Sequence, residues 1–285
     1  MANAGGSASA RTLSAPRAVF ADDAHVLVAD TGNHRVLVFD RTSPAEDAVR
    51  VLGQGDFVSA APNRGGNPTL GTLNTPTSVW SDGTRVVVAD TSNHRVLVWN
   101  TFPTVDGQAA DLVIGQDAAD GALPNRGLTA PSSTTLSAPA GVLGEGDALY
   151  VADTGNNRVL RFARVPTSSG AGATSVLGQV DFKSRFAAAS PDDRGALAGP
   201  TALATDGASL YVVDRDMNRV VSFPLPADGG LAEGPIVAAA TGAALSAPGG
   251  VAAERTGRFT SRLYVGDTGE DRVLLLSPVS RLLGQ

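Results

Sequence analysis

The sequence predicts an all-β fold assembled from similar units, and three observations lead to this prediction. Hydrophobic residues make up 42% of the 285 positions and charged residues only 18%, a balance that favours a packed core over a disordered chain. The 33 glycines and 17 prolines show no collagen period and are typical of many turns between short strands. In addition, a phrase of 14 residues returns along the chain, as it does in repeat proteins.

The phrase keeps the same order of residue types in all five copies. An apolar run leads into an aspartate, a polar turn follows, and an arginine opens a second apolar run. The five aspartates lie 60, 63, 61 and 53 residues apart. The copies are VLVADTGNHRVLVF at 26–39, VVVADTSNHRVLVW at 86–99, LYVADTGNNRVLRF at 149–162, LYVVDRDMNRVVSF at 210–223 and LYVGDTGEDRVLLL at 263–276.

Each unit predicts one antiparallel sheet of four short strands, which we call a, b, c and d in chain order. Strand b leads into the aspartate, and strand c begins at the arginine. Strand d ends at Gly-Gln in four units, the last of them at 281–285, whereas the fourth unit has a degraded form at 235–239. Strand a follows a proline, where a missing N–H removes no hydrogen bond from the sheet. These prolines are Pro16, Pro76, Pro139, Pro200 and Pro248.

The turn between strands b and c predicts a structural role for its aspartate and arginine. Asp and Asn side chains bond the local backbone in tight turns, Gly accepts positive φ, and the aspartate can pair with the arginine across the hairpin. Because the two residues are alike in every unit, we assign them to the scaffold and not to catalysis. The pairs are Asp30 with Arg35, Asp90 with Arg95, Asp153 with Arg158, Asp214 with Arg219 and Asp267 with Arg272.

Strands b and c are apolar on both faces, so neighbouring sheets must cover each sheet on both sides. Radial stacking satisfies this requirement and predicts a β-propeller of five four-stranded blades. We expect a single domain over residues 1–285, with blades at about 13–54, 73–116, 136–179, 197–240 and 245–285.

The combination of Pro-X-X-Val, LYVADTGNNRV and VLGQ resembles the NHL-repeat β-propellers over essentially the whole chain. That resemblance implies the propeller scaffold, which carries many unrelated activities. Such propellers are most often six-bladed, whereas this sequence holds five copies, so the alternatives are a five-bladed ring or part of a larger one. For a five-bladed ring we expect closure by apolar packing between blades five and one, with Leu274 and Leu37 at the seam.

Up-and-down connectivity places the b–c turns and the blade-to-blade connections at the same end of the fold. Three of these connections are long, at 55–72, 117–135 and 180–196, and they repeat a Pro-Asn-Arg-Gly phrase or a variant of it. Loops on a rigid scaffold are common binding sites. The candidate ligand residues on this face are Asn63, Arg64, Asn125, Arg126, Asp193, Arg194 and Met217.

Histidine offers the only metal candidates, His34 and His94, which occupy the same turn position in the first two units. Equivalent positions on stacked sheets lie about 10 Å apart or more, too far to share one metal away from the axis. His25 falls at the opposite end of the fold. The resemblance to peptide-amidating lyase propellers implies histidine ligands from several blades, which three histidines in these places do not supply, and we expect no cofactor.

The leading hypothesis is therefore a non-catalytic binding or assembly scaffold for a protein or carbohydrate ligand. The alternatives are a metal-dependent lyase or lactonase and a single-stranded RNA-binding protein. A net charge of −6 disfavours nucleic acid, and the sequence has no apolar run long enough to span a membrane. The start lacks the features of a signal peptide, as expected for a cytoplasmic protein or an exported one whose signal has been removed. The oligomeric state is left open.

Overall fold

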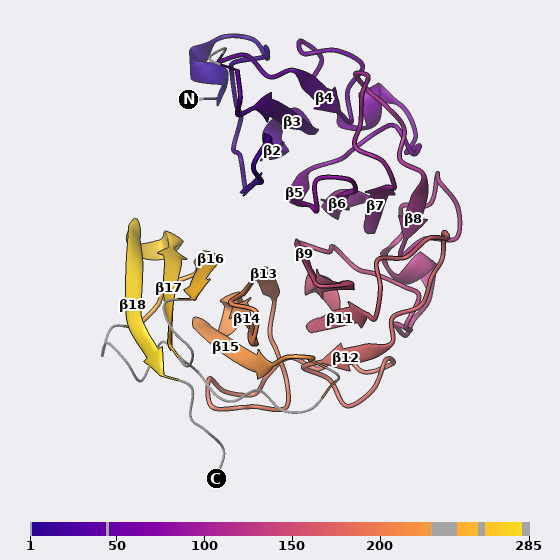
Figure 1. Cartoon of the computed structure of the whole chain (residues 1–285). Helices are drawn as coiled ribbons and strands as arrows, with labels where there is room; N and C mark the ends of the chain where they lie inside the picture. The colour runs from indigo at the N-terminus through magenta and orange to yellow at the C-terminus, as the bar shows by residue number, and fades with distance from the viewer. Residues whose placement is uncertain (1, 44–45, 228, 230–243, 256–259, 281–285) are drawn as a thin grey trace.

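The computed structural model describes residues 2–43, 46–227, 229, 244–255 and 260–280. Five antiparallel sheets are arranged around a common axis as the five blades of a β-propeller (Figure 1). Blade one consists of β1 (Ala18–Ala21), β2 (His25–Asp30), β3 (Arg35–Asp40) and β4 (Arg50–Leu52); blade two of β5 (Pro76–Ser81), β6 (Val86–Asp90), β7 (Arg95–Trp99) and β8 (Leu112–Ile114); blade three of β9 (Gly141–Glu145), β10 (Ala148–Asp153), β11 (Arg158–Phe162) and β12 (Ser175–Leu177).

Blades four and five each contain three described strands. They are β13 (Pro200–Thr205), β14 (Ser209–Asp214) and β15 (Arg219–Pro224) in blade four, and β16 (Pro248–Arg255), β17 (Thr260–Asp267) and β18 (Arg272–Ser280) in blade five. The strands expected at 235–239 and 281–285 lie outside the described residues. The predicted all-β fold, with antiparallel blades around an axis, is confirmed.

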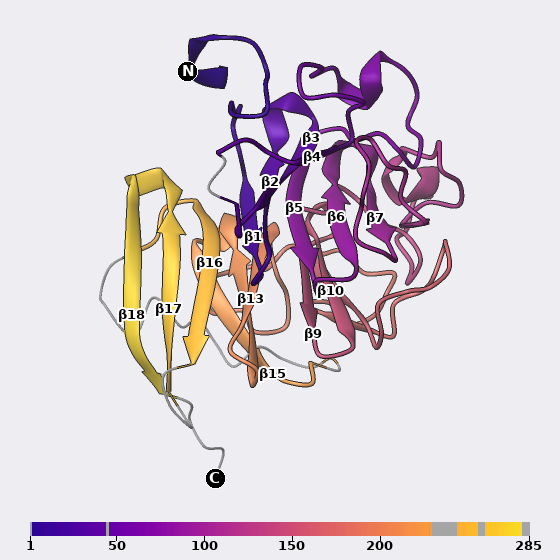
Figure 2. The same cartoon turned by 45° about the horizontal axis from the view of Figure 1, so that its top comes forward.

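Within each blade, the described strands follow chain order from the axis outward. The first strand of a blade lies nearest the axis and the fourth lies on the rim, as β9 and β12 illustrate (Figure 1). Figure 2 shows the strands of each blade running between the two ends of the fold, where the connections gather. Because consecutive strands pair antiparallel, the b–c turns and the described blade-to-blade connections come to one end, which we call the loop face.

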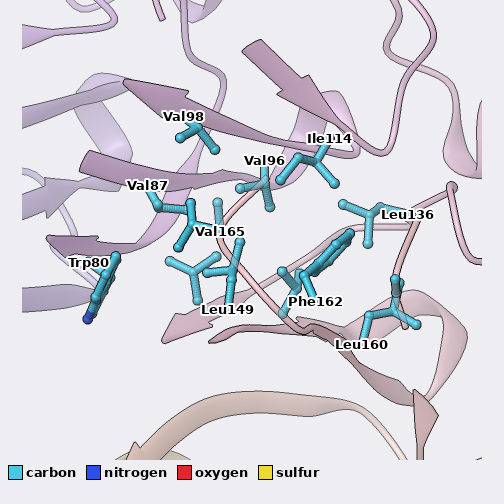
Figure 3. Close-up of a cluster of buried hydrophobic side chains, with 14 of the residues drawn as sticks. Trp80, Val87, Val96, Val98, Ile114, Leu136, Leu149, Leu160, Phe162 and Val165 are labelled. Carbon is cyan, nitrogen blue, oxygen red and sulfur yellow. The ribbon is translucent and has the colours of Figure 1, made fainter. Parts of the chain in front are cut away.

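The core consists of apolar layers between successive blades. Side chains alternate along each strand, so Val36 and Val38 of blade one are buried against blade two, where Trp99 lies in the same cluster. Figure 3 shows the next layer, in which Val87 and Val96 of blade two lie in one cluster with Leu149 and Phe162 of blade three. We call the side of a blade that meets the following blade its forward face and the other side its backward face.

The expected packing of Leu274 against Leu37 at the seam is wrong. Leu274 packs on the backward face of blade five, in the layer shared with blade four. Leu37 lies on the backward face of blade one, where it forms a small cluster with Ala48 and Val51 that Leu13 of the N-terminal segment also covers. The sequence assigned both leucines to the seam, but the alternation of the strand turns Leu274 toward its own preceding blade.

Candidate binding face

Each b–c turn is a single 3-10 turn that ends in a residue with left-handed backbone. In blade one the turn is η2 (Thr31–Asn33), and His34 follows it with φ 53° and ψ 44°. The same conformation returns in η4 (Thr91–Asn93), η6 (Thr154–Asn156), η7 (Arg215–Met217) and η8 (Thr268–Glu270). The loop face is therefore built from the same element in all five blades.

The aspartate and arginine of each turn form an ion pair below this face. In blade three, Nε of Arg158 donates to Oδ2 of Asp153 at 2.7 Å, and both side chains are fully buried. The other carboxylate oxygen accepts the backbone N–H of Ser137 at 2.7 Å. The remaining guanidinium nitrogens donate to the carbonyls of Phe182 and Thr135. One pair thus ties the turn to the connections on both sides of the blade.

The structure brings all five aspartate–arginine pairs together in this way. Burial raises the pKa of the Asp90 and Asp153 carboxyls, and the neighbouring guanidinium opposes that shift. The pair in blade five differs, because the side chain of Arg272 is 39% exposed. Since the charges and hydrogen-bonding atoms of the buried pairs are used within the scaffold, these residues hold the face in shape and do not offer a free acid or base.

The two candidate asparagines, Asn63 and Asn125, are buried in reciprocal amide pairs. The amide of Asn125 donates to Oδ1 of Asn156 at 3.0 Å, and the amide of Asn156 donates back at 2.8 Å. Asn63 makes the same pair with Asn93. The asparagines therefore fasten the long connections to the b–c turns of the following blades, and their amides point into the fold instead of toward a ligand.

The candidate arginines of these loops donate to backbone carbonyls of the neighbouring blades. Arg64 donates to the carbonyls of Gly53 and Gly107, at 3.3 Å and 3.1 Å. Arg126 reaches the carbonyl of Gly115 and forms an ion pair with Asp117. The two guanidinium groups lie at the loop face, but the hydrogen bonds given above join them to other groups of the protein.

Blade four departs from the sequence alignment of the loops. The N–H of Ala188 donates to the carbonyl of Leu197 at 3.0 Å, the bond that Asn63 makes to Leu73 in blade two. Ala188, and not Asp193, therefore occupies the asparagine position. Asp193 accepts the backbone N–H groups of Gly195 and Ala189, which lowers the pKa of its carboxyl.

The other two candidates of blade four are Arg194, in the same connection, and Met217, in the b–c turn η7. Arg194 is exposed. Met217, half-buried, takes the place that Asn93 and Asn156 hold in blades two and three. The pair of amides is thus replaced in blade four by Ala188 and Met217, two side chains without polar hydrogen-bonding groups.

The two candidate metal ligands are hydrogen-bonded to the backbone of the next blade. Nδ1 of His34 accepts the N–H of Thr75 at 2.9 Å, and Nδ1 of His94 accepts the N–H of Ala138 at 2.8 Å. Partial burial lowers the pKa of both imidazoles. Within the described residues no three His, Asp or Glu side chains gather as a metal site.

The three long connections also carry a set of exposed apolar side chains, which are not among the candidates from the sequence. Phe186 is 76% exposed and Leu123 is 62% exposed. The backbone carbonyl of Phe186 accepts the side-chain amide of Gln179, and that of Leu123 accepts the side-chain amide of Gln116. Since each glutamine ends strand d of its blade, Phe186 and Leu123 hold equivalent positions on neighbouring loops. Exposed apolar residues of the same loops are Val58, Leu128 and Val180. Their signal in the sequence is an apolar residue within a Gly-, Pro- and Asp-rich loop.

Comparisons with known proteins identify the repeat and the fold. The family model of the NHL repeat matches residues 18–39, which lie in β1 to β3 of blade one. The matched unit recurs along the chain in five blades, so the chain is similar to NHL-repeat β-propellers. A comparison with curated proteins finds no match. The helical segments in the described part of the chain are single short turns, and none has the length and apolar character needed to cross a membrane.

Two solved structures share this architecture. A catalytically inactive virginiamycin B lyase from Staphylococcus aureus, solved with quinupristin, is 14% identical with a TM-score of 0.51, and the match covers 94% of this chain and 67% of that one. An auxiliary nutrient binding protein from Bacteroides thetaiotaomicron is 11% identical with a TM-score of 0.53, covering 94% of this chain and 60% of that one. At these identities the likeness establishes the fold alone.

Proposed function

We propose that this propeller is a non-catalytic binding scaffold that docks a protein partner through the loop face. The observation that carries the proposal is the set of exposed apolar side chains on three neighbouring connections, with Phe186 and Leu123 at equivalent positions. Large apolar groups that stay exposed on an otherwise well-packed domain are typical of protein interaction sites.

The polar chemistry of the face favours a protein over a carbohydrate. Sugars are bound by free hydrogen-bonding side chains, whereas Asn63 and Asn125 are paired with other amides and Arg126 is paired with Asp117. What this part of the face offers outward is apolar area on a rigid frame. A rigid frame favours affinity, because little conformational entropy is lost on binding.

The experiment selects peptides from a phage-displayed random library on the immobilised chain and measures their Kd for variants. We expect selected peptides to lose at least tenfold in affinity with Phe186→Asp/Leu123→Asp, since burial of each large apolar side chain contributes about 1.5–3 kcal/mol. Val105→Asp would be a poor control. Because the β7–β8 connection that carries Val105 reaches Arg64 of the loop face, the control used instead is Leu275→Asp, at a residue that is 53% exposed and lies within β18 of blade five, away from the three long connections.

Three outcomes would contradict the proposal: a library that yields no binder, peptides that bind the double variant as tightly as the parent, or peptides that lose binding with Leu275→Asp. A glycan array probed in parallel tests the carbohydrate alternative. Glycan binding that survives Phe186→Asp/Leu123→Asp would place the ligand elsewhere. Arginine variants are unsuitable as probes of binding, because Arg64 and Arg126 brace the loops.

A further inference from the structure

The forward face of blade five keeps the residues that form the blade-to-blade layer elsewhere, yet it is uncovered. Tyr264 pairs with Leu275, and Gly266 with Val273, in the register in which Leu27 pairs with Val38, and Ala29 with Val36, in blade one. Leu27, Val36 and Val38 are fully buried under blade two. By contrast, Tyr264 is 37%, Val273 70% and Leu275 53% exposed.

The backward face of blade one is uncovered on its first strand, although Val28 and Leu37 on its second and third strands are buried. Val19 pairs with Val28 as Val79 pairs with Val88 in blade two. Val79 is buried in the layer between blades one and two, whereas Val19 is 66% exposed. Figure 1 shows blade five and blade one as the two ends of the arc, with the other blades packed in sequence between them.

Blade five and blade one also each carry one side of the polar contacts that join neighbouring blades elsewhere. In three interfaces a turn threonine donates to a proline carbonyl of the next blade, as Thr31 does to Pro76 at 2.6 Å. In four interfaces a left-handed residue after the turn accepts an N–H of the next blade, as Asn157 does from Gly199 at 2.9 Å. Blade five carries one side as Thr268 and Asp271, both exposed.

Blade one carries the other side. Ala15 has φ 45°, the left-handed backbone of Thr75, Ala138, Gly199 and Ala247 at the same position, and Pro16 follows it. Both are exposed. The segment before them also copies a blade-to-blade connection, because Asn3 is left-handed at φ 49° and forms the reciprocal amide pair with Asn33. Blade one is thus built to follow another blade.

We propose that the forward face of blade five and the exposed first strand of blade one form a slot for a sixth blade of this repeat. Such a blade presents the N–H of a left-handed residue to Asp271 and a proline carbonyl to Thr268. On its other side it presents a threonine and an acceptor side chain to Pro16 and Ala15. The apolar contacts continue the layers already seen between blades one to five, so the interface repeats an established one. This proposal is independent of the loop-face function, because none of its residues lies on the three long connections that carry Phe186 and Leu123.

The experiment uses the full chain and a variant in which residues 117–179 are appended after Gln285. Since Gln285 ends the same Gly-Gln phrase as Gln116, the junction repeats a native one and supplies one connection and one blade. The chain has no cysteine, so Val273→Cys reports the slot by its rate of maleimide labelling. Val58→Cys, on an exposed loop, is the control.

We expect fast labelling of Val273→Cys in the 285-residue chain and at least tenfold slower labelling in the extended chain, with Val58→Cys unchanged in both. We also expect the Tm to rise by about 5 °C or more, because a further apolar layer is buried. A Val151→Asp substitution in the appended copy should remove both effects, since it places a charge on the face that meets blade five.

Three results would overturn the proposal. The first is labelling of Val273→Cys that stays fast in the extended chain. The second is an intrachain disulfide between Ala15→Cys and Asp271→Cys in the 285-residue chain, which would mean that blade five closes directly on blade one. The third is a dimer in sedimentation that Val273→Asp dissociates, which would make a second copy the occupant.

Discussion

His34 and Thr75 join blade one to blade two through a hydrogen bond in which imidazole Nδ1 accepts the backbone N–H at 2.9 Å. His94 makes the same contact to Ala138. In the next two blades the acceptor is an asparagine oxygen, Asn157 or Asn218. What the position requires is an unprotonated acceptor on a left-handed residue, and a neutral histidine and an asparagine both meet that requirement.

The two histidines predict an acid-sensitive contribution to stability. Burial lowers the pKa of His34 and His94 below the ordinary value of 6.5, so the unfolded chain binds more protons than the folded one as the pH falls. This contribution is fully present above about pH 6.5 and is lost as the pH falls toward the lowered pKa values of the folded state. Protonation of Nδ1 would also remove the acceptor of the blade-to-blade bond.

The measurement is the free energy of unfolding from pH 8 to pH 4.5 for the parent and for His34→Asn/His94→Asn. We expect the double variant to retain most of the stability at pH 8, because asparagine makes this contact in blades three and four, and to lose less of it on acidification. Equal pH dependence in the two proteins would show that the histidines do not carry the effect. Because the carboxylates are the same in both proteins, the difference between the two pH dependences reports the histidines.

The buried ion pairs predict a contrast between equivalent arginines. Arg158→Ala leaves the buried Asp153 without its counter-ion and three carbonyls without donors, so we expect a loss of about 3–5 kcal/mol in the free energy of unfolding. In Arg272→Ala the lost guanidinium is 39% exposed while Asp267 is buried, so water can replace part of its contacts and we expect a clearly smaller loss than for Arg158→Ala. Urea denaturation measures both, and equal losses would contradict the role of burial.

The sequence predicted the blades and the turn pairs because both repeat. Alternation and spacing fix which residues form strands, and five copies of one turn identify Asp153 and Arg158 as scaffold. The directions of single loop side chains were beyond it. The sequence predicts that Asn125 is an exposed loop residue, and only the folded turn brings Asn156 beside it. The register of Ala188 depends on hydrogen bonds of the connection and not on the resemblance of PDDRG to PNRG. Whether Val273 is covered depends on what lies beside blade five.

The amide pairs give a prediction with a control taken from the chain itself. Asn125→Ala leaves the buried amide of Asn156 short of one donor and one acceptor contact, and we expect a loss of about 1–3 kcal/mol. Asn125→Ala/Asn156→Met copies the Ala188 and Met217 of blade four, so it should recover part of that loss. A double variant that is less stable by the full sum of the two single variants would contradict the pairing as the cause.

The last prediction concerns the approach of β9 to the indole of Trp80. A Cβ placed on Gly144 would overlap the six-membered ring of Trp80, which is buried in the layer between blades two and three together with Leu149. Gly144→Ala should therefore force the ring or the strand to move, at about 1–3 kcal/mol. Gly250→Ala is the control, because its Cβ meets nothing within 4 Å and its effect should stay within about 0.5 kcal/mol. Trp80→Leu makes room for the methyl group, so in a double-mutant cycle Gly144→Ala should cost at least 1 kcal/mol less in the leucine background than in the parent. A coupling energy near zero in urea denaturation would mean that the glycine is not required by the tryptophan.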